Sequence, residues 1–395
     1  MQSNHGTTQI TRRCFLSAAA GGAMAAPART PQKPETASTG SSQAVPMLHV
    51  TDLYRPHEDP DDHWDLACVF ALAYGGDADL RRVVIDHSLA LNDRVHDPDM
   101  LGVAQLNYMT SLSVPVAVGS PNRMTSRSDV SAANHGGVRA ILETLQDAPR
   151  PVVISILGSS RDVAIAGKKA PNLFADKCAG IYLNAGLGTR NVRLAKELRF
   201  DRANVNRDIL GFAAIFDLPC PVYWMPVLET WDFDMIRSGA VRECATMYRF
   251  RQGEILPFLS RMAQNYFAYM YRDGRFMDRP RKPESRWLGY LLGETEKDII
   301  DHHSDQDRLM WCTAGFFHAV GKTVDRDGRI VPLAEGAKKA VFEFNRARIS
   351  CDDAGLTEWA LDEKAKDRFV FRITDTGSYT KAMTVAMKTL LMTLP

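Results

Sequence analysis

The stretch MLHVTDLYRPHEDPDDHWDLACVFALAY, residues 47–74, joins a short apolar run to an apolar helical segment through an acidic loop. The loop holds Asp52, Glu58, Asp59, Asp61 and Asp62. Carboxylates crowded at the end of a buried strand are unfavourable unless they are solvated, protonated or bound to a cation. The stretch therefore predicts a strand-to-helix junction that binds a hard divalent cation, with calcium as the first candidate.

Ordinary helix and turn chemistry is a second explanation of the same acids. Asp61 and Asp62 favour the positive N-terminal end of a following helix, and Asp59 with Pro60 is a common turn pair. Such capping needs one or two carboxylates, and this loop has more, so we favour the cation site. Asp65, one turn further along, is either another acid facing that site or a solvated residue of the first turn.

Short β-branched runs alternate with helical segments along the rest of the chain. The runs lie at 47–50, 82–86, 114–119, 151–158, 180–186 and 221–227. This alternation predicts an α/β fold with an open, mostly parallel sheet and helices on both faces. Ligands of such sheets bind beyond the carboxyl ends of the strands, where the acidic loop begins at Asp52. We also expect a hairpin turning at Asp327 and Gly328, and a final strand and helix over 368–395.

The composition argues against some classes of partner and site. The 395-residue chain has 48 Lys and Arg against 47 Asp and Glu, a balance that does not favour nucleic acid as the partner. The six cysteines after Cys14 show no CxxC spacing, so neither a zinc site nor a dense disulfide framework is indicated. We expect most of them to be buried, and the sequence leaves open which pair forms a disulfide if one exists.

Residues 1–45 are interpreted as an export signal followed by a flexible leader. TRRCFL at 11–16 precedes a short run of small apolar residues, which is typical of a twin-arginine signal peptide. The run is too short to span a bilayer as a stable helix. We therefore expect a periplasmic or secreted protein without a membrane anchor, and a domain over 46–395 whose length suits one large α/β unit.

The aspartate loop resembles that of a known family. The layout of Thr51, Asp52, Asp61, Asp62 and the DLA at 65–67 is similar to the first loop of the calcium-dependent inosine-uridine nucleoside N-ribohydrolases. The chain looks most like an extended-loop subgroup, because the segment from Asp52 to Asp61 is longer than usual and Val50 replaces the first Asp of the family motif. The resemblance implies a nucleoside-hydrolase-like fold and a bound Ca²⁺.

The resemblance also implies roles for individual residues. Asp52 is expected to be both the catalytic base and a metal ligand, with Asp59 as the alternative, and Asp62 to be a bidentate ligand. The substrate-binding residues that it implies are Asp61, Asn92, His135, Asn204 and Glu229.

Two further segments extend the resemblance. His135 with its two following glycines is similar to an HGxxG segment of the family, and ILGSSRDVAIA at 156–166 looks like the segment whose main-chain carbonyl binds calcium, here that of Leu157. Asn204 matches an asparagine that grips the sugar. Arg161 and Arg202 depart from the family residues at their positions.

The last motif lies in HHSDQDRLMWCTAGFFHAV at 302–320, an acidic turn before an apolar helix. In the family a late HDP segment returns a carboxylate to the metal. Asp307 is the best match for that ligand, and Asp305 is the runner-up. We expect the chosen carboxylate to meet Asp62 although about 250 residues separate them.

Residues 231–300 are predicted to be a mostly helical insertion rich in aromatic residues, separated by basic turns. One interpretation is an aromatic lid that stacks on a planar ligand group. The alternative, which we favour, is a helical hairpin that packs its own aromatic stripe.

The sequence is best explained by a metal-dependent hydrolase of an N-glycosidic bond in a nucleoside or ribosyl-like small molecule. Activated water would attack through an oxocarbenium-like transition state. A non-catalytic calcium-dependent carbohydrate-binding protein and another kind of metallohydrolase stay open as alternatives, because fold alone does not decide activity. The substrate, the leaving group and any homo-oligomeric state are left open.

Overall fold

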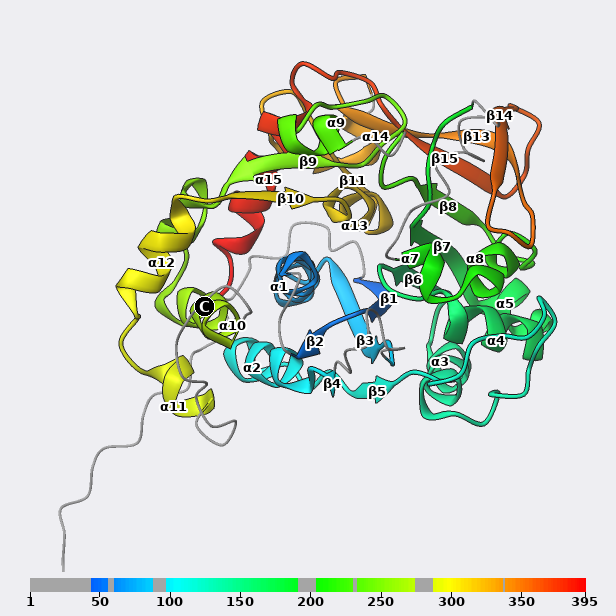
Figure 1. Cartoon of the computed structure of the whole chain (residues 1–395), viewed down its shortest axis with the longest axis horizontal. Coiled ribbons are helices and arrows are strands. Elements are labelled where there is room, and N and C mark those ends of the chain that lie inside the picture. The colour runs from blue at the N-terminus through cyan, green and yellow to red at the C-terminus, as the bar shows by residue number, and fades with distance from the viewer. Residues whose placement is uncertain are drawn as a thin grey trace, which may run out of the picture. The chain divides into compact units, whose positions relative to one another are not determined.

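A sheet of nine strands forms the centre of the fold in this computed structural model, which describes residues 44–55, 60–87, 97–190, 204–229, 233–273, 287–336 and 338–395 (Figure 1). The strands are β1 (Val45–Thr51), β3 (Ala78–Ile85), β5 (Val116–Val118), β6 (Val152–Ile156), β7 (Cys178–Asn184), β8 (Val222–Met225), β13 (Phe342–Cys351), β14 (Thr357–Leu361) and β15 (Arg368–Ile373). Their order is β14-β13-β15-β8-β7-β6-β1-β3-β5.

The sheet is mostly parallel, as the alternating pattern predicts. Strands β15, β8, β7, β6, β1, β3 and β5 pair in parallel, and all six apolar runs named above form strands. Strands β13 and β14 pair in the antiparallel sense at one edge, which the sequence pattern did not predict. The α/β fold class is confirmed.

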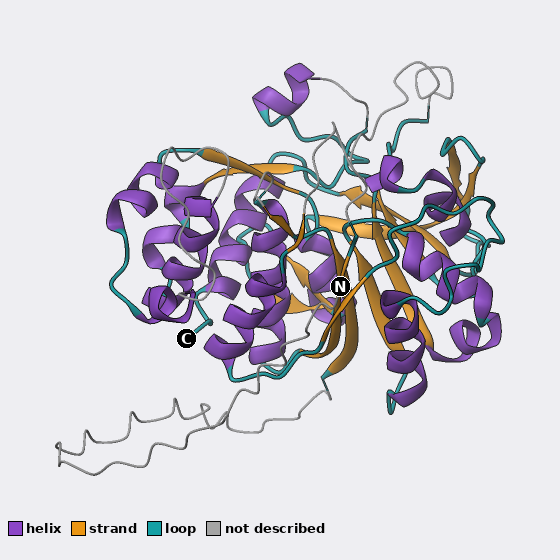
Figure 2. Ribbon diagram, turned by 60° about the horizontal axis from the view of Figure 1, so that its bottom comes forward, coloured by secondary structure: helices purple, strands orange, loops and turns teal. Residues whose placement is uncertain are grey.

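Helices cover both faces of the sheet (Figure 2). One face carries α1 (Asp61–Tyr74), α2 (Met100–Thr110), α10 (Arg261–Asp273), α13 (Thr313–Ala319) and α15 (Tyr379–Leu391). The other carries α3 (Gly136–Asp147), α4 (Arg161–Lys169), α5 (Pro171–Lys177) and α8 (Ile209–Ile215). The split follows from the pleat, since Met47 of β1 joins the first core and Leu48 and Val50 join the second.

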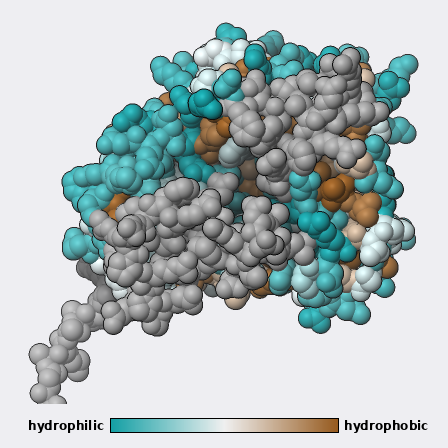
Figure 3. Space-filling model, in the orientation of Figure 1, coloured by the Kyte–Doolittle hydropathy of each residue, from teal (hydrophilic) through white to brown (hydrophobic). Residues whose placement is uncertain are grey.

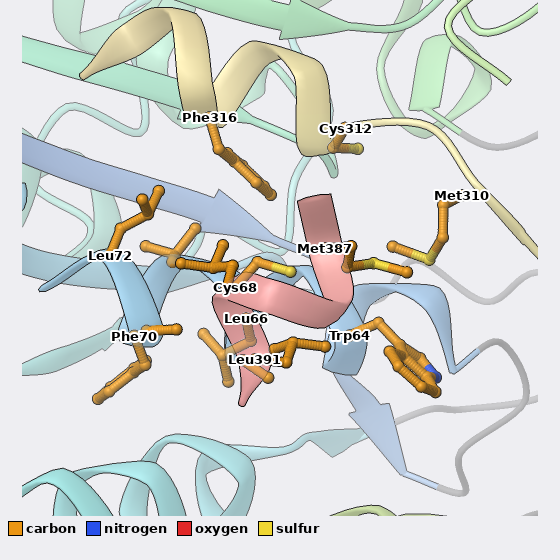
Figure 4. Packing of buried hydrophobic residues seen from close by; sticks show 14 of the residues in the cluster. Trp64, Leu66, Cys68, Phe70, Leu72, Met310, Cys312, Phe316, Met387 and Leu391 are labelled. Carbon is orange, nitrogen blue, oxygen red and sulfur yellow. The ribbon is translucent and has the colours of Figure 1, made fainter. Parts of the chain in front are cut away.

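Helix α1 is buried almost all round, which explains its apolar sequence. Its side chains from Trp64 to Leu72 pack among Phe316 of α13 and Met387 and Leu391 of α15 (Figure 4). Fully burying one such apolar side chain stabilises a fold by about 1.5–3 kcal/mol. The helix that follows the acidic loop is therefore fixed by the core, and it holds the first-turn acids in place.

The insertion over 231–300 contains a strand as well as helices. In its described part, β9 (Tyr248–Arg251) pairs with β10 (Asp307–Met310), and α9 (Phe233–Ser238), α10, α11 (Trp287–Leu292) and α12 (Lys297–Ser304) are helical. The aromatic side chains of Tyr266 and Tyr271 are buried, and the Trp64 indole donates to the Tyr271 hydroxyl at 3.0 Å. These aromatics belong to the first core, whereas Trp231 lies outside the described residues.

The C-terminal elements confirm the predicted hairpin, strand and helix. Strands β11 (Lys322–Val324) and β12 (Ile330–Pro332) pair in the antiparallel sense. The turn between them contains Gly328 at φ 81°, a conformation that favours glycine. Strand β15 and helix α15 then complete the chain.

Where Figure 3 shows described residues, the surface is mainly hydrophilic, with exposed hydrophobic residues in small groups. Large hydrophobic side chains that remain exposed include Met100, Phe258 and Met392. Scattered exposed apolar residues are normal for folded proteins. Among the residues that the structure describes, none of the helices combines the length and the apolarity needed to cross a bilayer.

All six cysteines after Cys14 are buried thiols, and two of them contact each other. Ala179 is an extra residue in β7, since Val152 pairs with Cys178 and Val153 with Gly180. This bulge turns the Cys178 side chain toward the core that also contains Cys220. A hydrogen bond to Cys220, together with burial, raises the pKa of the Cys178 thiol.

We predict that Cys178 and Cys220 form the disulfide if the chain is exposed to an oxidant such as oxidised glutathione. The expected result is an intact mass lower by two hydrogens and a gain of about 2–4 kcal/mol in the free energy of unfolding. Cys178→Ser should abolish both changes, whereas Cys68→Ser, which removes another buried thiol, should leave them. A disulfide in the Cys178→Ser protein would contradict the assignment.

Candidate functional site

Five aspartates gather where β1 and β3 end and α1 begins, and we call them the acid cluster: Asp52, Asp61, Asp62, Asp65 and Asp86. Asp65 and Asp86 are almost fully buried, at 1% and 2% exposure. Asp61 and Asp62 stay partly accessible. The cluster thus has a buried floor and a more accessible side, as a binding site requires.

Neighbouring parallel strands position the cluster. The amide of Asp86 donates to the Thr51 carbonyl at 2.8 Å, and the amide of Leu157 donates to the Val50 carbonyl at 2.9 Å. A Cβ atom on Gly158 would lie 3.1 Å from the Cβ of Asp52. The residues that directly follow β1, β3 and β6 therefore lie together at the carboxyl ends of these strands, where ligands bind in this class of fold.

Burial and mutual repulsion perturb the carboxyl groups of the cluster. Burial, followed by the charges of Asp52 and Asp61, raises the pKa of Asp62 well above its usual value. Burial raises the pKa of Asp65 to about 8. It also raises that of Asp86 to about 6, although Arg161 and Arg207 oppose the rise. The surroundings therefore do not fully compensate the charged forms of these carboxyl groups, and either protonation or a bound cation would relieve their repulsion.

Three arginines supply the positive charge around the cluster. Arg207 pairs with Asp52, Arg161 pairs with Asp86 at 2.9 Å, and Arg308 lies 3.7 Å from Asp61. Among the described residues, five carboxyl groups thus face three guanidinium groups. Because the pKa values of Asp62 and Asp65 are raised, these two groups favour their protonated forms near neutral pH, and a divalent cation would supply the positive charge that ionises them.

Tyr54 connects two of these pairs. Its hydroxyl donates to Asp86 at 3.2 Å and accepts a hydrogen bond from Arg207 at 2.9 Å. The Arg207 guanidinium also lies over the Tyr54 ring, 4.9 Å from its centroid. Tyr54 therefore holds Arg207 beside Asp52.

The acid cluster offers the donor chemistry of a calcium site. Carboxylate and main-chain oxygens are the ligands that Ca²⁺ prefers. The groups of Asp52, Asp62 and Leu157 lie together at the carboxyl ends of the neighbouring strands β1 and β6. In the conformation described, however, no three His, Cys, Asp or Glu side chains of the described residues converge as metal ligands do. Arg207 holds the Asp52 carboxylate that the ion would need.

The structure does not bring Asp307 to the acid cluster. Its carboxylate is 47% exposed and lies 3.5 Å from Arg249, and Asp305 pairs instead with Arg251 at 2.9 Å. Adjacent side chains of β10 point to opposite sides, so Arg308, and not Asp307, faces the cluster.

Cys312, which directly precedes α13 as Figure 4 shows, is another residue late in the chain that contacts the cluster. Its thiol forms a hydrogen bond with Asp65 and lies 3.3 Å from the Asn184 side-chain oxygen. The motif that predicts a late carboxylate gives no signal at this position, because cysteine carries no carboxylate. A thiol, that of Cys312, therefore lies near the cluster where a late carboxylate, that of Asp307, was predicted.

Three other predicted site residues lie beside groups that are not part of the acid cluster. Asn204, in α7 (Asn204–Arg207), is buried and donates to the Asn184 main-chain oxygen at 2.9 Å. His135 precedes α3 and lies near Asp162, and Glu229 follows β8 near Cys244. Three residues of the sequence-based hypothesis lie outside the described residues: Asp59, Asn92 and Arg202.

Asp86, Tyr54 and Arg207 are site residues that the sequence motifs did not predict. Asp86 follows its strand as Asp52 follows β1, so strand-end position was an available signal. Arg207 lay in the segment that was searched for sugar-binding groups, but an arginine there has no place in that pattern. Its partner becomes evident only from the folded chain.

Comparisons with solved structures place the fold beside nucleoside hydrolases. A purine-preferring ribonucleoside hydrolase from Gardnerella vaginalis is similar at a TM-score of 0.50, with 13% identity over 88% of this chain and 99% of that one. The effector protein XOO4466 gives 0.49, with 16% identity over 89% and 95%. The inosine-uridine preferring nucleoside hydrolase from Bacillus anthracis gives 0.45, with 12% identity over 87% and 99%.

Comparisons of sequence identify no relative. No protein-family profile matches the chain, and no curated protein matches it. At such low identity the structural likeness shows the fold alone. The chain therefore has a nucleoside-hydrolase-like α/β fold.

Proposed function

We propose that this chain hydrolyses an N-glycosidic bond of a nucleoside or ribosyl-like small molecule at the acid cluster. The observation that supports the proposal is the gathering of Asp52, Asp61 and Asp62 at the carboxyl end of β1, where Asp52 is buried and Asp61 and Asp62 are partly accessible. The fold, shared with a nucleoside hydrolase, is consistent with that chemistry.

The proposed chemistry assigns a different task to each carboxylate. Asp52 accepts a proton from the attacking water as the C–N bond breaks, the departing base takes up a proton from solvent, and Asp61 accepts hydrogen bonds from sugar hydroxyls. Carboxylates that lie beside the sugar stabilise the positive charge that develops on it in an oxocarbenium-like transition state. Proton transfer to a positioned carboxylate contributes roughly 10²–10⁴-fold to a rate.

Calcium is part of the proposal. Asp52, Asp62 and the Leu157 carbonyl would hold the ion, and the chemistry it supplies when bound is to orient a water and lower its pKa. The expected fourth protein ligand, Asp307, pairs elsewhere, so water or sugar hydroxyls complete the coordination in this proposal.

Binding of a sugar without turnover is the second candidate. The observation that favours it is the pairing of Arg207 with Asp52, since the carboxylate that would accept the proton already binds a guanidinium group. The two candidates differ in one measurable property, which is release of the leaving group.

We predict that hydrolysis of N-ribosides requires calcium and Asp62. After treatment with a chelator, release of free base from a panel of nucleosides should stop and should return when Ca²⁺ is added. Asp62→Ala should remove calorimetric Ca²⁺ binding and activity together, because it deletes the expected bidentate ligand.

Asp301→Ala, on the exposed side of α12, is the matched control and should behave as the unmodified protein. Nucleoside binding without release of base would support the sugar-binding candidate. Activity that persists in the chelator would remove calcium from the proposal.

A further inference from the structure

Arg207 is a buried cation placed on the carboxylate that the proposed metal would need. Its side chain is 10% exposed and that of Asp52 is 7% exposed, and the two form an ion pair. Buried ion pairs are screened far less by water than surface pairs. The pair therefore has a strong influence on any other cation that approaches Asp52.

The position of Arg207 is set by the fold on both sides. Before it, Asn204 anchors α7 to the end of β7 through the Asn184 carbonyl. After it, Asp208 caps α8 by accepting from the Gly211 amide at 2.9 Å and also accepts from the Met124 amide at 2.8 Å. The guanidinium is thus held by a short, doubly anchored segment.

Tyr54 adds a second attachment that fixes the direction of the guanidinium. One terminal nitrogen of Arg207 donates to the Tyr54 hydroxyl at 2.9 Å, and the other pairs with Asp52. The same hydroxyl donates to Asp86, so the arrangement is continuous across the cluster. Such a pre-oriented guanidinium loses little freedom when it binds a carboxylate.

We propose that Arg207 is a built-in counter-cation that competes with divalent metal ions for Asp52 and so sets the metal affinity of the acid cluster. A metal ion held by Asp52 and Asp62 would have to displace the guanidinium from Asp52 or lie close to it, and both alternatives weaken binding. Arg207 is accordingly an affinity-determining residue. This inference rests on the proposed assignment of Asp52 and Asp62 as ligands.

Direct calorimetric titration with Ca²⁺ tests the inference without an activity assay. Arg207→Met keeps much of the side-chain volume and removes the charge, so it should bind Ca²⁺ about tenfold to a thousandfold more tightly than the unmodified protein. Arg207→Lys keeps the charge and should bind within a few-fold of the unmodified protein. Arg348→Met is the control, because Arg348 is exposed and pairs with Asp362 on another part of the sheet.

Thermal unfolding provides a second readout on the same proteins. Without added metal, Arg207→Met should melt at a lower temperature than the unmodified protein, because the Asp52 charge is left buried without its partner. Added Ca²⁺ should recover more of the melting temperature in Arg207→Met than in Arg348→Met.

The outcomes separate this inference from the proposed function. Tighter Ca²⁺ binding by Arg207→Met, with no N-riboside hydrolysed by any variant, supports the role of Arg207 and refutes the activity. Equal or weaker Ca²⁺ affinity in a folded Arg207→Met protein overturns the role of Arg207, whatever the activity. Failure of every variant to bind Ca²⁺ overturns it as well.

Discussion

Replacing Asp52 by Asn is expected to lower kcat for N-riboside hydrolysis by roughly 10²–10⁴-fold, the usual cost of losing a general base. The amide has nearly the same shape as the carboxylate but cannot accept the proton of the attacking water. Asp52 directly follows β1 and is 8% exposed, so the substitution changes the chemistry of a well-held group. Single-turnover kinetics with saturating nucleoside measures the effect on the chemical step.

Two comparisons make the Asp52→Asn result specific. Asp301→Asn changes an exposed aspartate of α12 and should leave kcat unchanged. Asp59→Asn tests the alternative base in the extended loop. If Asp59→Asn loses activity and Asp52→Asn keeps it, the base has been assigned to the wrong end of that loop.

The parallel sheet could be predicted from the sequence because its strands are buried on both faces. Runs such as PVVISILG are apolar at almost every position, and they match β6 closely. Strands β13 and β14 were not predicted, because β13 alternates buried and exposed residues irregularly and lies toward an antiparallel edge. Edge strands with one solvated face leave a weaker pattern than central ones.

The acidic half of the site could also be predicted, and its basic half could not. Asp52, Asp61 and Asp62 are neighbours in sequence, so their repulsion is visible before folding. Arg207 is 155 residues from Asp52, and only the fold shows that the two meet. A cation whose partner is distant in sequence has no local signal.

The prediction of Asp307 as a late metal ligand failed for a different reason. The expectation for Asp307 rested on an acidic turn before an apolar helix, and that turn exists between α12 and β10. The Asp307 carboxylate pairs with Arg249. Strand β10 starts at Asp307, and the alternation of side chains along the strand decides which of them face the acid cluster. A shift of one residue in a strand exchanges Asp307 for Arg308, which reverses the charge facing the cluster.

Replacing Arg161 by Met is expected to lower the free energy of unfolding by about 3–5 kcal/mol, the range for breaking a buried ion pair on one side. Arg161 has no exposed surface, pairs with Asp86 at 2.9 Å and lies 4.0 Å from Asp208. Its removal leaves these buried carboxylates without the positive charge that they share. Chemical denaturation followed by circular dichroism measures the loss.

Asp86→Asn in the Arg161→Met background separates charge from packing in this result. If the uncompensated carboxylate causes the loss, the double variant should recover part of the stability, because the amide carries no charge. Lys168→Met, which breaks a partly exposed pair with Asp217, is the control and should cost about 0–1 kcal/mol. A loss for Arg161→Met no larger than that of Lys168→Met would show that the buried network contributes little to stability, and Arg161 would then have to be explained by binding rather than by folding.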